Sequence, residues 1–252
     1  MTRVGADPDN ISCHTQPVTD PAGPAANTVE VLAEARNRDG RSPLEWLAEL
    51  LPASPGPVIE VSAPASDAGA RVRLRRLDSG ETMLGGPDAL PLPENSAAGV
   101  RAVMCLPSVE RLDELFAELR RVLRPAGTLV ALVPSRPGLS VAQLRAWWPL
   151  ERVFAQCPGC RNGFRNASAR DHLGWYLAAA DFAVLMDRRQ VFQLPVSVAR
   201  DTRALASGLV AAGVWPPGLT AAQFDAAHSV LSRHAASSRQ LPIPLRLLVG
   251  RR

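Results

Sequence analysis

Residues 88–135 read DALPLPENSAAGVRAVMCLPSVERLDELFAELRRVLRPAGTLVALVPS, and this stretch decides the fold class. Its middle has apolar residues at helical spacing, with Ser108 as the expected N-cap and Gly127 as the expected turn after the helix. Apolar runs on either side, Val100–Leu106 and Thr128–Pro134, predict buried strands. A strand, a helix and a second strand in succession indicate an α/β sheet covered by helices.

Further elements are predicted on both sides of this stretch. Ser42 and Pro43 are typical of a helix start, and Val58–Val61 is a short apolar strand. In ARVRLRRLDSGE, Val72 and Leu74 alternate with arginines, which indicates a strand with one wet face and a turn after it. Towards the C-terminus we expect a strand over 182–196, helices over 199–234 and a last strand in IPLRLLVGRR.

The composition is that of a globular chain. It has 252 residues, 46% of them hydrophobic and 21% charged, with a formal net charge of +4. All 28 basic residues are arginine, and they are spread along the chain, whereas a nucleic-acid binder more often concentrates them in a patch. We find neither an apolar run long enough for a membrane span nor a secretory signal, and we expect a cytoplasmic protein with no nucleic-acid or membrane partner.

The stretch quoted first resembles the class I S-adenosylmethionine-dependent methyltransferases, in particular the type 11 group. Leu90–Ser96 is similar to the A-L-P-F-P-D-x-S signature before strand four, and Glu118–Gly127 to the E-x-x-R-V-L-R-P-G-G helix end. The resemblance covers roughly residues 45–252. It implies a Rossmann-like methyltransferase sheet with helices on both faces, and a substrate cap formed by segments 138–180 and 199–240.

The cofactor loop of that family is degenerate in this chain. Its E-V-G-x-G-x-G pattern keeps Glu60 and Val61, but the three glycine positions hold Ser62, Pro64 and Ser66. Glycine lets a backbone approach a ligand closely, whereas proline and serine add atoms there. These residues therefore predict a site that has lost its cofactor.

The acidic residues of the family pattern are also displaced. The carboxylate that binds the ribose at the end of strand two has Asp78 as its candidate, which equally suits a turn. The acidic position near the adenine becomes Gly86, with Asp88 as a poor substitute, and the aspartate of S-F-D becomes Ala98.

Chain length points the same way. Residues 63–70 separate the first two predicted strands, and a parallel crossover needs about a dozen or more. The helix that lies under the cofactor in the family then has no room. We therefore expect a sheet truncated at strands two and three, which form an antiparallel hairpin.

Other residues could carry chemistry. Cys157 and Cys160 have zinc-knuckle spacing without a clear second pair, so a metal site, a redox pair and ordinary loop cysteines stay open. His172 beside Asp171 is either a general base or a surface residue. A group of aromatic residues either lines a ligand pocket or packs in a core: Trp147, Trp148, Phe154, Phe164, Trp175 and Tyr176. His228 and His234 are expected to face solvent.

The sequence thus predicts a disordered tail over 1–28 and a methyltransferase-like domain over 29–252. The favoured function is a non-catalytic partner or regulatory subunit of a biosynthetic enzyme, with no cofactor and no metal. Its partner would be an active methyltransferase, another enzyme, or a second copy in a homodimer. The alternatives are an active S-adenosylmethionine-dependent methyltransferase with a rearranged pocket, and a ligand-binding cap. No catalytic residue is identified.

Overall fold

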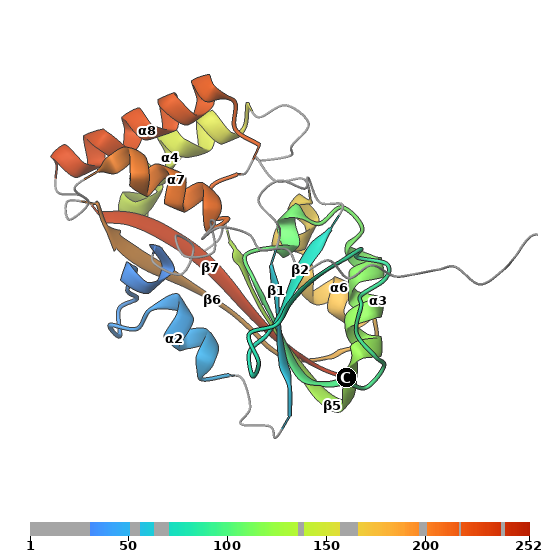
Figure 1. Ribbon diagram of the computed structural model, residues 1–252. Helices are drawn as coiled ribbons and strands as arrows, with labels where there is room; N and C mark the ends of the chain where they lie inside the picture. Colours follow the sequence, from blue (N-terminus) through green and yellow to red (C-terminus); the bar gives the residue numbers. More distant parts are fainter. Residues whose placement is uncertain are drawn as a thin grey trace, which may run out of the picture.

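The computed structural model describes residues 31–50, 56–62, 71–135, 139–156, 166–196, 201–216, 218–237 and 240–252 (Figure 1). The predicted tail 1–28 lies outside these residues, as do Pro64, Ser66 and both cysteines of the CxxC pair.

One seven-stranded sheet forms the centre of the described structure, with the strand order β3-β2-β1-β4-β5-β7-β6. Its strands are β1 (Val58–Ser62), β2 (Val72–Arg76), β3 (Thr82–Gly85), β4 (Ala97–Val103), β5 (Leu123–Pro134), β6 (Ala183–Pro195) and β7 (Gln240–Arg251). Strand β4 lies parallel to both β1 and β5, whereas β7 is antiparallel to β5 and to β6. The prediction of a Rossmann-like methyltransferase sheet is confirmed.

Helices cover both faces of this sheet (Figure 1). One layer holds α2 (Pro43–Ala48), α4 (Val141–Phe154), α7 (Thr202–Ala211) and α8 (Ala221–Ala236). The other holds the 3₁₀ turn η1 (Leu106–Ser108), α3 (Leu112–Val122), α5 (Ala167–Asp171) and α6 (Leu173–Ala179). A hydrophobic core lies on each face of the sheet, and strand β5 contributes side chains to both. Val130 and Leu132 face the first layer of helices, whereas Leu129 and Ala131 face the second. The described helices of the predicted cap segment 138–180 therefore lie on opposite faces of the sheet, with α4 on one face and α5 and α6 on the other.

Strands β1, β2 and β3 form an antiparallel meander at one end of the sheet. The register joins Ser62 to Arg73 and Ile59 to Arg76. Val72 and Leu74 are buried, whereas the arginines between them are half-buried or exposed, which confirms the strand with one wet face. The predicted hairpin of β2 and β3 is also confirmed, with Arg76 N donating to Glu81 O at 2.9 Å across the turn.

Two details around α3 differ from the prediction. Ser108 does not cap the helix, because it belongs to η1 and the helix begins at Leu112. The strand before it ends at Val103 instead of Leu106, because Met104 turns the chain with a φ of +58°.

After α3, the left-handed residue of the turn is Ala126, with a φ of +62°, and not Gly127. Gly127 is needed for space instead, since a Cβ there would lie 2.8 Å from Arg124 O.

The prediction that both late histidines face solvent is wrong for His234, which is buried. Its Nδ1 donates to Val230 O at 2.8 Å. His228 is half-buried, with Nε2 at 3.0 Å from Thr202 Oγ1 and 3.3 Å from Ser232 Oγ. Every helix within the described segments is too short or too polar to span a bilayer.

Candidate functional site

The carboxyl ends of β1 and β4 define the edge where ligands bind in open α/β sheets. These strands are parallel neighbours, with Val61 beside Ala102, so that Ser62 and Val103 end at the same edge of the sheet. This edge is the place to test the predicted cofactor residues.

The chain that leaves β4 fills part of this edge with buried side chains. Met104 N donates to Leu132 O at 2.7 Å, and Cys105 Sγ donates to Val61 O at 3.3 Å. Cys105 is 2% exposed, and its burial raises the pKa of the thiol to about 12. A thiol that stays protonated is a poor nucleophile, so Cys105 acts here as a packing residue.

The connection between α7 and α8 packs against the same turn. Gly213 has a φ of +67°, and a Cβ on it would lie 2.8 Å from Met104 O. Trp215, which follows closely, is fully buried and lies against Phe154 at a ring-centroid distance of 5.6 Å. At Gly213, the connection between α7 and α8 therefore lies directly against the backbone of the turn after β4.

Glu60 and Ser62 lie on the polar side of β1. Glu60 forms an ion pair with Arg101 of β4, and its side chain is 20% exposed. This pair lies across two neighbouring strands, on the face opposite to buried Ile59 and Val61. Glu60 therefore serves as a cross-strand partner of Arg101 in this structure.

Asp78 lies at the far edge of the sheet. Because β2 is antiparallel to β1, its end is beside Val58, roughly 13 Å from Ser62 at the usual rise of a strand. Arg76 donates to Asp78 Oδ1 at 3.2 Å and to Oδ2 at 2.9 Å. These hydrogen bonds hold the pKa of Asp78 below its ordinary value.

Asp88 occupies the space of the acidic position that the family pattern puts at Gly86. A Cβ built on Gly86 would collide with the Asp88 carboxylate, so Gly86 leaves room for it. That carboxylate pairs with Arg111 Nη2 at 3.0 Å and is about half exposed. Ala98 is buried in β4.

The remaining candidates have other partners. Asp171 pairs with Arg170 at 2.8 Å, and His172 caps the short helices α5 and α6. The described segments contain no group of three or more His, Cys, Asp or Glu side chains that could hold a metal ion.

The aromatic residues do not gather into one pocket, contrary to the hypothesis of a shared ligand site. Trp147 and Phe154 pack on the α4 side of the sheet, 6.3 Å apart. Tyr176 packs on the opposite side, 6.4 Å from Phe116. Trp148 and Trp175 are exposed, at 58% and 67%, and Phe164 lies outside the described residues.

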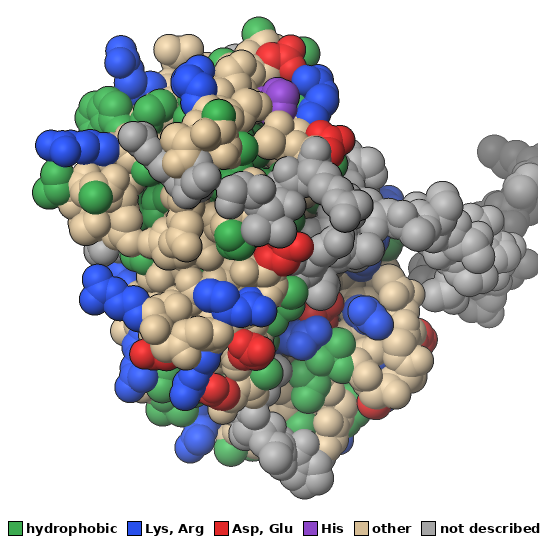
Figure 2. Space-filling view, turned by 90° about the vertical axis from the view of Figure 1, so that its left-hand side faces the viewer, with side chains coloured by type: hydrophobic (Ala, Val, Ile, Leu, Met, Phe, Trp, Pro, Cys, Tyr) green, Lys and Arg blue, Asp and Glu red, His purple; other side chains and the backbone are tan. Residues whose placement is uncertain are grey.

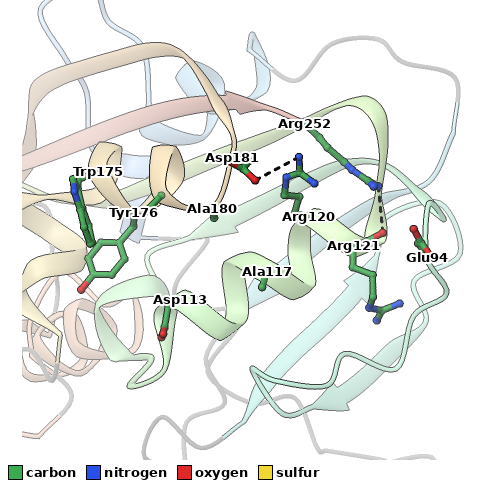
Figure 3. A pocket seen from close by; sticks show the side chains of 11 residues that line it. Glu94, Asp113, Ala117, Arg120, Arg121, Trp175, Tyr176, Ala180, Asp181 and Arg252 are labelled. Atoms are coloured by element: carbon green, nitrogen blue, oxygen red, sulfur yellow. Dashed lines mark hydrogen bonds and ion pairs between the residues drawn. The ribbon is translucent and has the colours of Figure 1, made fainter.

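A hollow that sequence reasoning missed lies between α3 and α6 (Figure 3). It measures about 740 Å³ and lies on the α3 side of the sheet. The signal in the sequence was weak, since it consists of Ala117 on one helix and Ala179 on another, where larger side chains would close the space.

Residues 45–131 match the family model described as a methyltransferase domain. A comparison with curated proteins finds none that matches this sequence.

Three of the similar solved structures are described by their names. A protein of Bacillus halodurans assigned as a methyltransferase is 11% identical, with 84% of this chain and 99% of that one covered and a TM-score of 0.49. A protein of Anabaena variabilis, assigned as a methyltransferase from an antibiotic biosynthesis pathway, is 13% identical over 65% and 70%, with a TM-score of 0.41. The [4+2]-cyclase SpnF is 18% identical over 67% of this chain, with a TM-score of 0.36, and this chain spans only 54% of its length.

The family match covers the stretch in which both signatures were identified, and the sheet order agrees with the expected architecture. Residues 45–131 are therefore similar to a methyltransferase domain, and the sheet has the Rossmann-like architecture of the class I methyltransferase fold.

Proposed function

We propose that this protein is a non-catalytic member of the methyltransferase-like proteins, which has lost S-adenosylmethionine binding and supports a biosynthetic enzyme as its partner or regulatory subunit. The observation that carries this proposal is the antiparallel pairing of β1 with β2, with Ser62 opposite Arg73. It changes the geometry of the edge where the cofactor would lie.

Because β1 and β2 pair antiparallel, β2 begins at the cofactor edge, where β1 ends. A parallel second strand would require a crossover along the sheet face, usually with a helix whose N-terminus offers its amide groups to a ligand. Here only positions 63–71 separate Ser62 from Val72, and β2 begins at the edge where β1 ends. The residues in place therefore offer the adenosyl group a poor fit.

The acidic residues support the same conclusion. Asp78 lies at the opposite edge of the sheet, bonded to Arg76, so its carboxylate is out of reach of a ribose beside Ser62. The position of the adenine acid is Gly86, whose space Asp88 fills. Asp78 therefore does not take the position of the ribose acid, and Asp88 enters the space of the adenine acid from two positions later in the chain, where it pairs with Arg111.

A partner surface follows from the polar face of the meander. Arg73, Arg75 and Arg101 lie on this face together with Glu60, and their side chains are half-buried or exposed. Figure 2 shows a different side of the molecule, the left-hand side of Figure 1, where basic and acidic side chains intermingle over the lower half. Because arginine predominates on the meander, the partner chemistry that fits it is an acidic protein surface. A second copy of this chain would be the homodimeric alternative.

Isothermal titration calorimetry with S-adenosylmethionine and with S-adenosylhomocysteine tests the loss of the cofactor. We expect no heat of binding at ligand concentrations up to about 1 mM, a level that corresponds to roughly 4 kcal/mol. Binding in the micromolar range to either compound contradicts the proposal. A thermal unfolding curve of the same sample shows that the protein is folded.

The partner role is tested by charge reversal. The double variant Arg73→Glu and Arg75→Glu should lose the stoichiometric protein that co-purifies from the native host, identified by mass spectrometry. The matched control reverses Arg188 and Arg189, which are exposed on β6, and should keep it. A monodisperse monomer that recovers no stoichiometric partner, or equal loss in both variants, argues against this surface.

An active methyltransferase with a rearranged pocket is the second candidate, and the family match over residues 45–131 favours it. Glu60, the one acidic residue kept from the loop pattern, would then exchange Arg101 for the ligand. The same titration separates the candidates, because micromolar binding supports this one and refutes the first.

A further inference from the structure

The hollow between α3 and α6 combines a small-residue floor with an aromatic wall. Ala117, Ala179 and Ala180 line it, and their short side chains leave the space between the helices open. Its volume of about 740 Å³ is within the range of small-molecule sites. It lies against α3 (Figure 3), and no residue of β1 lines it.

Trp175 and Tyr176 form the aromatic wall at one end of this hollow (Figure 3). Their rings meet edge to face, with centroids 5.2 Å apart and planes at 79°. Tyr176 is braced from behind by Phe116, whereas Trp175 is 67% exposed. An exposed indole held by a packed tyrosine gives a planar ligand a surface for stacking.

Arg120 brings a loosely paired guanidinium to the same hollow. Its Nε is buried and has no hydrogen-bond partner, so a ligand reaches this guanidinium only at its other nitrogen atoms. Its Nη2 lies 4.0 Å from Asp181 Oδ2, which is beyond hydrogen-bond distance, and Asp181 is 83% exposed. Figure 3 shows these two side chains facing one another. A guanidinium N–H forms a charge-assisted hydrogen bond with a carboxylate oxygen.

The other guanidinium groups around the hollow are already engaged. Arg121 donates to both oxygens of Glu118 and to Leu90 O. Arg252 donates to backbone oxygens and to Asn95. The hollow also contains Glu94 and Asp113, so its charge does not attract anions in general. Selectivity must come from Arg120 and from the rings.

We propose that the α3–α6 hollow binds a small aromatic carboxylate, with the ring of the ligand against Trp175 and its carboxylate beside Nη2 of Arg120. The ligand carboxylate takes the place beside Arg120 that Asp181 holds only loosely. This site is independent of the proposed loss of S-adenosylmethionine binding, and either proposal can fail without the other.

The test is a titration of the full chain, followed by the indole N–H signals in ¹H–¹⁵N NMR spectra. The probes are phenylacetate and indole-3-acetate, each compared with its methyl ester. We expect the Trp175 signal, assigned by its loss in Trp175→Ala, to shift with a dissociation constant of about 1 mM, as suits a ligand of this size in an open site. The esters should bind at least tenfold more weakly.

Variants locate the interaction. Arg120→Gln should weaken carboxylate binding at least tenfold, whereas Asp181→Asn should strengthen it severalfold because a like charge is removed. Arg152→Gln and Trp148→Ala are matched controls, since both residues are exposed on α4 on the other face of the sheet, and neither should change binding. Circular dichroism confirms that each variant is folded.

Three results would overturn this inference. The first is an unmoved Trp175 signal at 10-fold excess over the expected constant, and the second is equal binding of acid and ester. The third is a folded Arg120→Gln variant that binds the acids as the parent chain does.

Discussion

Glu118 fastens the segment before β4 to helix α3, and its replacement by glutamine gives a well-defined prediction. Glu118 Oε2 accepts from Leu90 N at 2.8 Å, and its two oxygens accept from Arg121 Nε at 2.7 Å and Nη2 at 2.8 Å. The side chain is only 16% exposed. The hydrogen bonds of this carboxylate thus join buried Leu90 to the helix that carries the second family signature.

Glu118→Gln should lower the free energy of unfolding by about 2 kcal/mol. A hydrogen bond to a charged group contributes roughly 1.5–3 kcal/mol, and glutamine keeps one acceptor oxygen while turning an N–H₂ towards another donor. For a chain of this size, about 2–4 °C is expected per kcal/mol, so the Tm should fall by about 4–8 °C. Urea unfolding at pH 7 followed by circular dichroism measures the change.

The effect should depend on pH with a definite sign. The hydrogen bonds from Arg121 hold the pKa of Glu118 below its ordinary value, with a further contribution from Leu90 N–H. A lowered pKa in the folded state means stabilisation that is complete above the unfolded value of about 4.3 and lost as the pH falls through the folded value. The difference between the parent chain and Glu118→Gln should therefore shrink between pH 7 and pH 3.

The control is Glu49→Gln, whose ion pair with Arg41 at 2.6 Å has both side chains about half exposed. It should cost no more than about 0.5 kcal/mol, as exposed pairs usually do. If Glu118→Gln costs no more than this control, or if its effect persists unchanged at pH 3, the role assigned to this carboxylate is wrong.

Three further predictions concern single residues in the connections between helices and strands. Ala126→Gly should raise the free energy of unfolding by roughly 0.5–1 kcal/mol, because relief at the left-handed φ of Ala126 exceeds the added chain entropy; unchanged or lower stability in urea would contradict it. Gly213→Ala should lower the free energy of unfolding by about 1–3 kcal/mol, because the added Cβ would lie 2.8 Å from Met104 O. A urea midpoint equal to that of the parent chain would contradict this prediction. Cys105 should resist iodoacetamide at pH 8 in the native protein and react in urea, because burial raises its pKa to about 12; peptide mapping that finds native labelling would refute its burial.

The sheet architecture could be predicted because the strongest hydrophobic patterns of the sequence lie in the buried strands and in the helix that packs on them. The stripe of α3 and the runs of β4 and β5 belong to a buried layer, where hydrophobic periodicity and structure agree. The alternating arginines of β2 predicted a strand with one wet face, which the structure bears out. Turn details were less predictable, since Ser108 and Gly127 suit the expected positions locally, but tertiary packing gives them other roles.

The candidate site was predictable only in part. Asp78 and Asp88 were named from the family pattern, but that pattern does not reveal that β2 runs antiparallel to β1 and carries Asp78 to the far edge. The contact of Asp88 with the space at Gly86 also depends on a turn in three dimensions. Arg120 and Trp175 lie 55 positions apart on two helices, and no local pattern joins them.

The meander of β1, β2 and β3 also has a consequence for how the chain folds. Its strands are linked through positions 63–71 and 77–81, so their pairing closes short loops, whereas β6 reaches β7 only across the whole of α7 and α8. Short loops cost little entropy to close, and hairpins form within microseconds. We therefore expect the meander to form early in folding, before the longer-range pairing of β4 with β1.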